Sequence, residues 1–227
     1  MTAVTAVGAN DTRLWGLTAE ERLRRIARAQ GMETGGSAAD LLVNLGHAFD
    51  PAWLRFIAGR PNHVVTFGGV PVLANATAER EAIREAMERQ QPLPPTNLTV
   101  IAWEESGGLT NDELRKRERP FMNRLAPETV RNLERASYFG AYKGVTDILT
   151  KYLWPEWALV LTRWAARIGM TPNQVTLIGA LLCVAATFAF YYGWYWSGLA
   201  MGLVFMVLDT VDGKLARCTI TSSWWGN

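Results

Sequence analysis

The sequence predicts an α/β domain at the N-terminus, followed by an all-α transmembrane module. Two observations support this division. Up to about residue 153 the chain mixes short apolar runs with charged, amphipathic helical patterns, which is typical of an α/β domain. From Trp154 onward the chain is apolar and holds most of its ten Trp residues, and it includes an uncharged run long enough to cross a bilayer.

Bulk composition excludes several functional classes. The 227 residues are 49% hydrophobic and carry a formal net charge of +2, which favours neither disorder nor binding to nucleic acid. The positions of the two Cys residues, Cys183 and Cys218, indicate neither a disulfide framework nor a metal site. The N-terminus lacks the basic start and apolar core of a signal peptide, so membrane insertion would depend on the later apolar segments.

The first domain is predicted to span residues 1–125. Three helices are expected after the N-caps Thr18, Asp50 and Thr77, the first of them in a capping box with Glu21. Strands are predicted at Leu41–Leu45, at His63–Phe67 and Val70–Ala74 around a Gly68-Gly69 turn, and at Asn97–Trp103. Helices and strands intermixed in this way indicate an α/β sandwich.

A connecting arm is predicted over residues 126–153. It begins with a helix at Pro127–Ala136, with Pro127 at its first position. Further on, Lys143, Asp147 and Lys151 are spaced four apart and share one helix face, which is the pattern of a solvent-exposed salt-bridge ladder.

The membrane module is predicted over residues 154–227 and begins with an amphipathic helix at Pro155. Its large apolar residues recur every three or four positions and form a single stripe: Trp157, Leu161, Trp164 and Ile168. Arg163 and Arg167 lie off this stripe. The pattern predicts a helix at the membrane interface, and the alternative is a helix that packs on the soluble domain.

Two spans follow the amphipathic helix. Thr171 and Pro172 begin the first, and residues 175–192 contain no charge over eighteen positions. Gly193 breaks this helix, and residues 195–208 form the second span. Basic residues flank the outer ends of both spans, which places those ends in the cytoplasm by the positive-inside rule. A pair of buried core helices is the alternative.

Asp209 and Asp212 come directly after the second uncharged run, where carboxylates are costly and commonly functional. At about 100° per residue, Asp212, Gly213, Ala216 and Arg217 all lie within roughly 80° of Asp209 on a helix. One face therefore carries two carboxylates, two small residues and a cation. The carboxylates suit a hard divalent cation, the small residues let a phosphate approach the backbone, and the guanidinium offers a planar fork for phosphate.

This stretch, D-x2-D-G-x2-A-R-x8-G, resembles the signature of the CDP-alcohol phosphotransferases (the CDP-alcohol phosphatidyltransferase family). The matching residues are Asp209, Asp212, Gly213, Ala216, Arg217 and Gly226. The full family pattern continues with x3-D-x3-D, so its last two aspartates would lie beyond Asn227. We therefore expect this chain to be the front part of an enzyme, holding the first two helices of a six-helix bundle, and to be inactive by itself.

The resemblance implies a role for each residue of the signature. Asp209 and Asp212 would bind Mg²⁺, or Mn²⁺ in its place. Together with Gly213, Ala216, Arg217 and Gly226 they would bind the CDP and phosphate groups. The base that activates the acceptor hydroxyl would lie beyond Asn227, so no catalytic base is expected among these residues.

Two further matches are shorter. Asn173 and Thr176 resemble the family's P-N-x-x-T entry to its first membrane helix, where they would line the nucleotide pocket, although capping and packing explain them equally well. Lys143 and Asp147 resemble a K-x-x-x-D arm that lies near the membrane site in fused enzymes of this family. The salt-bridge ladder remains the alternative for that pair.

The N-terminal domain has a weaker resemblance. Residues 14–31 are similar to the early helix of sugar-phosphate nucleotidyltransferases, a region that often precedes the CDP-alcohol module. The Gly-rich nucleotide loop of those enzymes is reduced to one glycine, Gly8, so we expect a degenerate domain kept for packing or regulation. His47 follows a predicted strand end, where a site residue could lie, but a surface or core role is favoured.

Together these patterns predict an integral-membrane transferase of phospholipid biosynthesis. It would move a substituted phosphate group from a CDP-alcohol, first of all CDP-diacylglycerol, to an acceptor alcohol and release CMP. Its soluble domain and active site would face the cytoplasm, and homodimers are common in the family. The alternatives are a non-catalytic membrane-anchored partner-binding protein, or a bifunctional enzyme whose N-terminal domain makes the CDP-alcohol.

Overall fold

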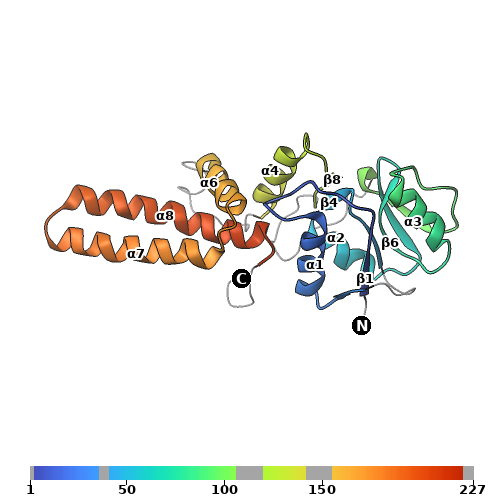
Figure 1. Ribbon diagram of the computed structural model, residues 1–227, viewed down its shortest axis with the longest axis horizontal. Helices are drawn as coiled ribbons and strands as arrows, with labels where there is room; N and C mark the ends of the chain where they lie inside the picture. The colour runs from blue at the N-terminus through green and yellow to red at the C-terminus, as the bar shows by residue number, and fades with distance from the viewer. Residues whose placement is uncertain (1–2, 36–40, 106–119, 142–154, 222–227) are drawn as a thin grey trace. The chain divides into compact units, whose positions relative to one another are not determined.

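The structure is a computed structural model that describes residues 3–35, 41–105, 120–141 and 155–221. The chain forms two compact units, Met1–Gly140 and Ala141–Asn227, coloured blue to yellow and orange to red in Figure 1. Two sets of predicted residues lie outside the described residues: the arm residues Lys143, Asp147 and Lys151, and the signature residue Gly226.

A six-stranded mixed sheet in the order β2-β1-β3-β6-β5-β7 forms the centre of the first unit. Its strands are β1 (Ala3–Val7), β2 (Glu33–Thr34), β3 (Leu41–Asn44), β5 (His63–Phe67), β6 (Val70–Asn75) and β7 (Thr99–Ala102). β1 runs parallel to both of its neighbours, whereas β6 is antiparallel to both of its neighbours. The four predicted strands are therefore confirmed, and the predicted turn has Gly68 and Gly69 at positive φ.

Helices cover both faces of this sheet. α1 (Ala19–Ala29) and α2 (Pro51–Ala58) lie together on one face, and α3 (Arg80–Glu88) lies on the other (Figure 1). The α3 side contains a buried apolar cluster of Val7, Leu42, Val64, Ala74, Ala76, Ile83 and Met87. The predicted capping box is present, since Thr18 Oγ1 accepts from Glu21 N at 3.2 Å and Glu21 Oε2 accepts from Thr18 N at 3.0 Å. The α/β sandwich predicted for this part of the chain is confirmed.

A two-stranded ribbon and a fourth helix complete the first unit. β4 (His47–Phe49) pairs with β8 (Met122–Arg124), and η1 (Trp103–Glu105) follows β7. α4 (Val130–Gly140), which the sequence placed in the connecting arm, is joined to the unit by a buried hydrogen bond of 2.8 Å from Trp15 Nε1 to Ser137 Oγ.

Two predicted helix starts are wrong, that of α3 by two residues and that of α4 by three. Thr77 does not cap α3, because Ala76 is buried in the core and a turn places Glu79 in the left-handed conformation at the N-cap, with φ 59°. Similarly, Pro127 lies in a turn, and α4 begins at Val130. The Thr129 hydroxyl holds that turn by accepting from Ala126 N at 3.0 Å.

The second unit contains a helical hairpin and a helix that crosses it. α7 (Pro172–Tyr191) and α8 (Tyr195–Cys218) run side by side along their length (Figure 1). Thr171 Oγ1 caps α7, as predicted, by accepting from Gln174 N at 3.3 Å. Gly193 ends the helix with φ 79°. The hairpin is closely packed at Gly198, where an added Cβ would lie 2.8 Å from the Phe190 ring.

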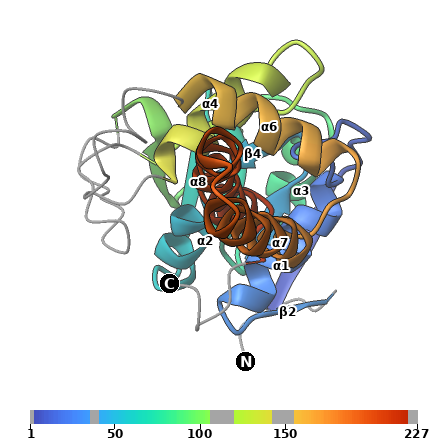
Figure 2. The same ribbon diagram turned by 90° about the vertical axis from the view of Figure 1, so that its left-hand side faces the viewer.

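α6 (Pro155–Arg167) crosses the hairpin axis, as the end-on view in Figure 2 shows. One face of α6 is buried and packs on α8; it contains the small or compact residues Ala158, Leu159, Thr162, Ala165 and Ala166. The predicted apolar stripe lies on the other, exposed face, where Trp157 is 73% and Trp164 is 59% exposed. The helix is therefore apolar on two sides. The predicted stripe is the exposed side, and the sequence did not predict the buried side that packs on α8.

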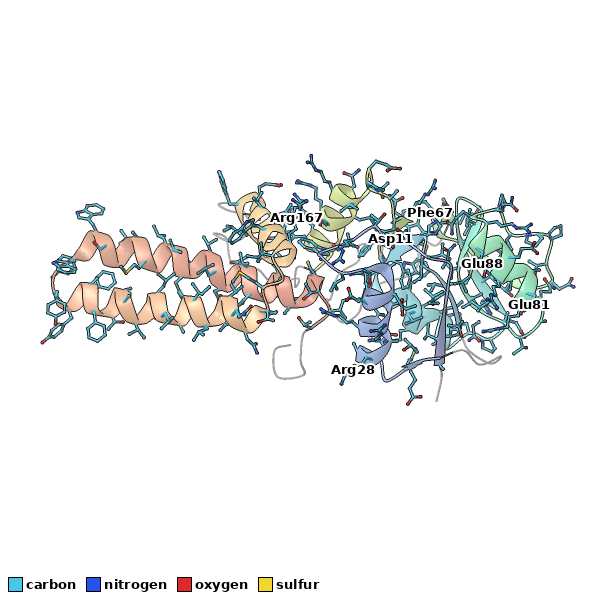
Figure 3. All side chains as sticks on the ribbon, in the orientation of Figure 1. Asp11, Arg28, Phe67, Glu81, Glu88 and Arg167 are labelled. Atoms are coloured by element: carbon cyan, nitrogen blue, oxygen red, sulfur yellow. The ribbon has the colours of Figure 1, made fainter. Side chains whose placement is uncertain are left out.

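Among the described residues, α7 is the one helix long and apolar enough to cross a membrane. Large apolar side chains project from it along its length (Figure 3), including Leu177, Leu181 and Phe188. α8 does not meet the same criterion, because its apolar first half runs into Asp209, Asp212, Lys214 and Arg217. The first predicted span is therefore supported by length and composition, and the second stays a proposal.

Candidate active site

The signature residues lie in the second half of α8, which continues as a helix through Cys218. Asp209 is exposed, whereas Asp212, Gly213, Ala216 and Arg217 are half-buried. Because the helix is unbroken, the positions i, i+3, i+4, i+7 and i+8 share one face, as the sequence predicted. The structure therefore brings these five residues together on one side of α8.

Thr176 connects the signature to the neighbouring helix. Its Oγ1 donates a hydrogen bond of 2.7 Å to Asp212 Oδ2 and also lies 3.1 Å from Pro172 O in its own helix. A hydroxyl donor on a carboxylate is a charge-assisted hydrogen bond, which is stronger than a neutral one. Thr176 thus holds one carboxylate oxygen of the signature in a fixed position.

Asp212 lies beyond the predicted span, and burial raises the pKa of its carboxyl group because desolvation disfavours the charged form. The hydrogen bond from Thr176 acts in the opposite direction, and the charge of Asp209 adds to the upward shift of this pKa. The two carboxylates therefore repel each other where they stand, and a cation between them would relieve that repulsion.

Arg217 is held by two backbone carbonyl groups. Its Nε donates to Gly213 O at 2.9 Å, and its Nη1 donates to Ala141 O at 2.6 Å. An added Cβ on Gly213 would lie 3.1 Å from Arg217 Nη2. Glycine at this position therefore leaves room for the guanidinium to lie against the helix.

The donor chemistry of this face fits a hard divalent cation. Asp209 and Asp212 offer carboxylate oxygens one helical turn apart, and Mg²⁺ is commonly bound by one or two carboxylates together with substrate phosphates. Within the described ranges, no group of three or more His, Cys, Asp or Glu residues is placed to hold a metal. These two carboxylates would therefore need further ligands, such as phosphate oxygens.

The remaining predicted residues divide into two groups. Asn173 is exposed in the first turn of α7, and no described residue shares a hydrogen bond with its side chain. Lys143, Asp147 and Gly226 lie outside the described residues, so their roles stay predictions. The sequence did not indicate two features: the Ala141 carbonyl as an acceptor, because a backbone group has no side-chain pattern, and the burial of Lys214, one of the basic residues that follow the second predicted span.

The second unit is thus an apolar helical hairpin whose second helix carries two carboxylates and an arginine on one face. Residues 169–227 match the CDP-alcohol phosphatidyltransferase family, which confirms the predicted resemblance for this segment. This region includes both α7 and α8 and begins just after α6.

Three curated relatives share sequence with this chain. A phosphatidylinositol phosphate synthase of Streptomyces avermitilis is 36% identical over 83 residues, which cover 35% of this chain and 34% of that protein. An archaetidylinositol phosphate synthase of Pyrococcus horikoshii is 39% identical over 64 residues, covering 27% and 32%. A phosphatidylinositol phosphate synthase of Cutibacterium acnes is 36% identical over 75 residues, covering 31% and 36%. The chain thus spans about a third of the length of the curated relatives it matches.

Proposed function

We propose that the second unit is the start of a CDP-alcohol phosphotransferase domain, which transfers a substituted phosphate group from a CDP-alcohol to an acceptor hydroxyl and releases CMP. The observation that carries this proposal is the shared face of Asp209, Asp212 and Arg217 on α8, within the segment that matches the family. Two carboxylates and one guanidinium provide opposite charges for a metal-bound diphosphate.

Each residue of this face has a proposed part in binding. Asp209 and Asp212 would hold Mg²⁺ or Mn²⁺, and such an ion supplies electrostatic stabilisation of the charge on the diphosphate. Thr176 would orient Asp212 through its 2.7 Å hydrogen bond. Arg217 would turn its remaining guanidinium N–H groups to phosphate oxygens, and Gly213 would allow that approach.

The substrates follow from the names of the relatives. Those proteins are synthases of phosphatidylinositol phosphate and archaetidylinositol phosphate, so we propose an inositol phosphate as the acceptor here. CDP-diacylglycerol is the proposed donor, which places the reaction in phospholipid biosynthesis. The two aspartates that would complete the site, including the catalytic base, are proposed to lie after residue 227.

We also propose that α6 lies in the membrane interface while the hairpin crosses the bilayer. The support is geometric, since α6 crosses the hairpin axis and keeps Trp157 and Trp164 exposed. Trp side chains favour the interfacial region. The signature and the soluble unit would then face the cytoplasm.

The transferase proposal is tested by CMP release in proteoliposomes that contain CDP-diacylglycerol and an inositol phosphate. In protein expressed from the complete coding sequence, Asp209→Asn and Asp212→Asn should each lower kcat/KM by about 10²- to 10³-fold, as expected for lost electrostatic stabilisation. Asp11→Asn, an exposed carboxylate of the first unit (Figure 3), is the matched control and should leave turnover unchanged.

The same assay on residues 1–227 alone should give no CMP. Mg²⁺-dependent CMP release by this segment would contradict the assignment of the missing aspartates. Full turnover in Asp209→Asn would contradict the role of the signature itself.

A further inference from the structure

Residue 141 supplies a group to the signature from outside the segment that matches the family. Ala141 belongs to the second unit, as Arg217 does, and it precedes residues 169–227, over which the family match extends. Its backbone carbonyl accepts the 2.6 Å hydrogen bond from Arg217 Nη1, across 76 positions of the chain. The cation of the signature face is therefore bonded to a part of the chain that the signature motif does not include.

The Ala141 carbonyl needs a donor from elsewhere in the chain. Ala141 directly follows the last residue of α4, and the carbonyl groups at a helix end lack a partner within the helix. The residue is buried, with 8% of its surface exposed, and a buried carbonyl without a donor is destabilising. Arg217 provides a charged donor, which forms a stronger hydrogen bond than a neutral one.

Two contacts fix the plane of the Arg217 guanidinium. Nε donates to Gly213 O at 2.9 Å, and Nη1 donates to Ala141 O. Because the guanidinium is planar, hydrogen bonds at both of these nitrogens restrict its rotation. The absence of a side chain on Gly213 leaves the necessary space, since a Cβ there would lie 3.1 Å from Nη2. The guanidinium is therefore held in one orientation before any ligand binds.

Nη2 is the part of this guanidinium that remains for a ligand. Among the described residues, none accepts a hydrogen bond from Nη2, and Arg217 lies on the α8 face that also carries Asp209 and Asp212. A side chain that is already held loses little further freedom when it binds a phosphate oxygen, which increases affinity. A lysine could not do the same, because an ammonium on a flexible stem has no planar fork to hold.

We propose that the backbone carbonyl of residue 141 is a positioning group for the CDP-alcohol, which holds Arg217 so that Nη2 meets the diphosphate. This inference rests on the proposed transferase function. A carbonyl that served only the fold would affect the donor equally with or without the arginine. A positioning role requires that its effect passes through Arg217 and disappears when Arg217 is replaced.

The first test weakens this acceptor and leaves every side chain in place. Nonsense suppression at position 142 incorporates the α-hydroxy acid analogue of tyrosine, which makes the carbonyl of residue 141 an ester carbonyl, a weaker acceptor. The 227-residue chain is labelled with ¹⁵N-arginine in micelles, and the Arg217 signals are those absent from Arg217→Lys. Rotation of the Nη1 group should be about 5-fold faster in the ester variant, because part of one hydrogen bond is lost. An unchanged rate would overturn the proposal.

The second test measures the KM for CDP-diacylglycerol in protein expressed from the complete coding sequence. The ester should raise this KM by about 5- to 10-fold and leave the KM for the acceptor unchanged. Arg217→Lys should raise it at least as much, and the ester should then have no further effect. Arg167→Lys, at an exposed arginine that ends α6 (Figure 3), is the matched control and should leave this KM unchanged.

The outcomes of the second test separate this inference from the transferase proposal. An ester effect of equal size with and without Arg217 would assign the carbonyl to the fold alone and overturn the inference. A KM that responds to Arg217→Lys but not to the ester would also overturn it, and would leave the transferase proposal intact. Turnover that neither Asp209→Asn nor Asp212→Asn lowers would instead overturn the transferase proposal, and this inference with it. Circular dichroism would confirm that each variant is folded.

Discussion

Replacing Thr176 with Val removes the hydroxyl that donates to Asp212 but keeps the shape of the side chain. The lost hydrogen bond is 2.7 Å long and joins α7 to α8. Hydrogen bonds to charged groups contribute about 1.5–3 kcal/mol, and partial exposure of this pair places the expected loss near the lower limit, at about 1.5 kcal/mol. The free energy of unfolding of the hairpin should therefore fall by about that amount at neutral pH.

The measurement is reversible unfolding in mixed micelles, followed by Trp fluorescence. Thr176→Ser is the control, because it keeps the hydroxyl and should retain most of the stability. In the complete enzyme Thr176→Val should also lower kcat/KM for CMP release, since Asp212 is no longer held. Equal losses for Val and Ser, or no loss for Val, would refute the view that this hydroxyl positions the signature carboxylate.

Three other changes test the packing and electrostatics of the two units. Burial and the nearby charge of Arg124 lower the pKa of His47 to about 4 from 6.5. As the pH falls, the unfolded chain therefore binds a proton at His47 before the folded chain does. The free energy of unfolding should fall by at most about 3 kcal/mol between pH 6.5 and pH 4. His47→Gln should flatten this pH profile in urea titrations, and an unchanged profile would contradict the assignment. Gly198→Ala should destabilise the hairpin by about 1–3 kcal/mol relative to Gly202→Ala. The reason is that a Cβ at residue 198 meets a neighbour within 4 Å, whereas a Cβ at residue 202 does not. Equal unfolding midpoints of the two variants in micelles would contradict this prediction. Asp50→Ala should remove the cap on Ala52 N and lower the urea midpoint by the equivalent of about 1 kcal/mol, whereas an unshifted midpoint would show that the cap is unimportant.

Local chemistry explains what the sequence predicted well. The caps at Thr18, Asp50 and Thr171 act within three residues of themselves, and their hydrogen bonds are formed as expected. The shared face of the signature follows from helical periodicity alone. By contrast, the cap predicted at Thr77 failed, because burial of Ala76 in the core decides where that turn lies.

The sequence patterns did not predict features that depend on partners far along the chain. β1, β4 and β8 are short, and each is a strand only because a segment far along the chain pairs with it. The hydrogen bond from Arg217 to the Ala141 carbonyl joins residues 76 positions apart, and a backbone acceptor has no sequence signal. The sequence left two explanations open for Thr176, a structural role in capping or packing and a place at the site. The hydrogen bond to Asp212, which joins two helices, supports the second explanation.

The transverse position of α6 has a consequence for the depth of the proposed metal-binding carboxylates in the membrane. α6 packs on α8 through its small side chains and exposes Trp157 and Trp164 on the other side. If those indoles anchor at the headgroup level, α6 fixes the depth of Asp209 and Asp212 relative to the bilayer surface. In thinner or thicker membranes the hairpin would then tilt or extend at its far, aromatic end, while the carboxylates stay level with the headgroups.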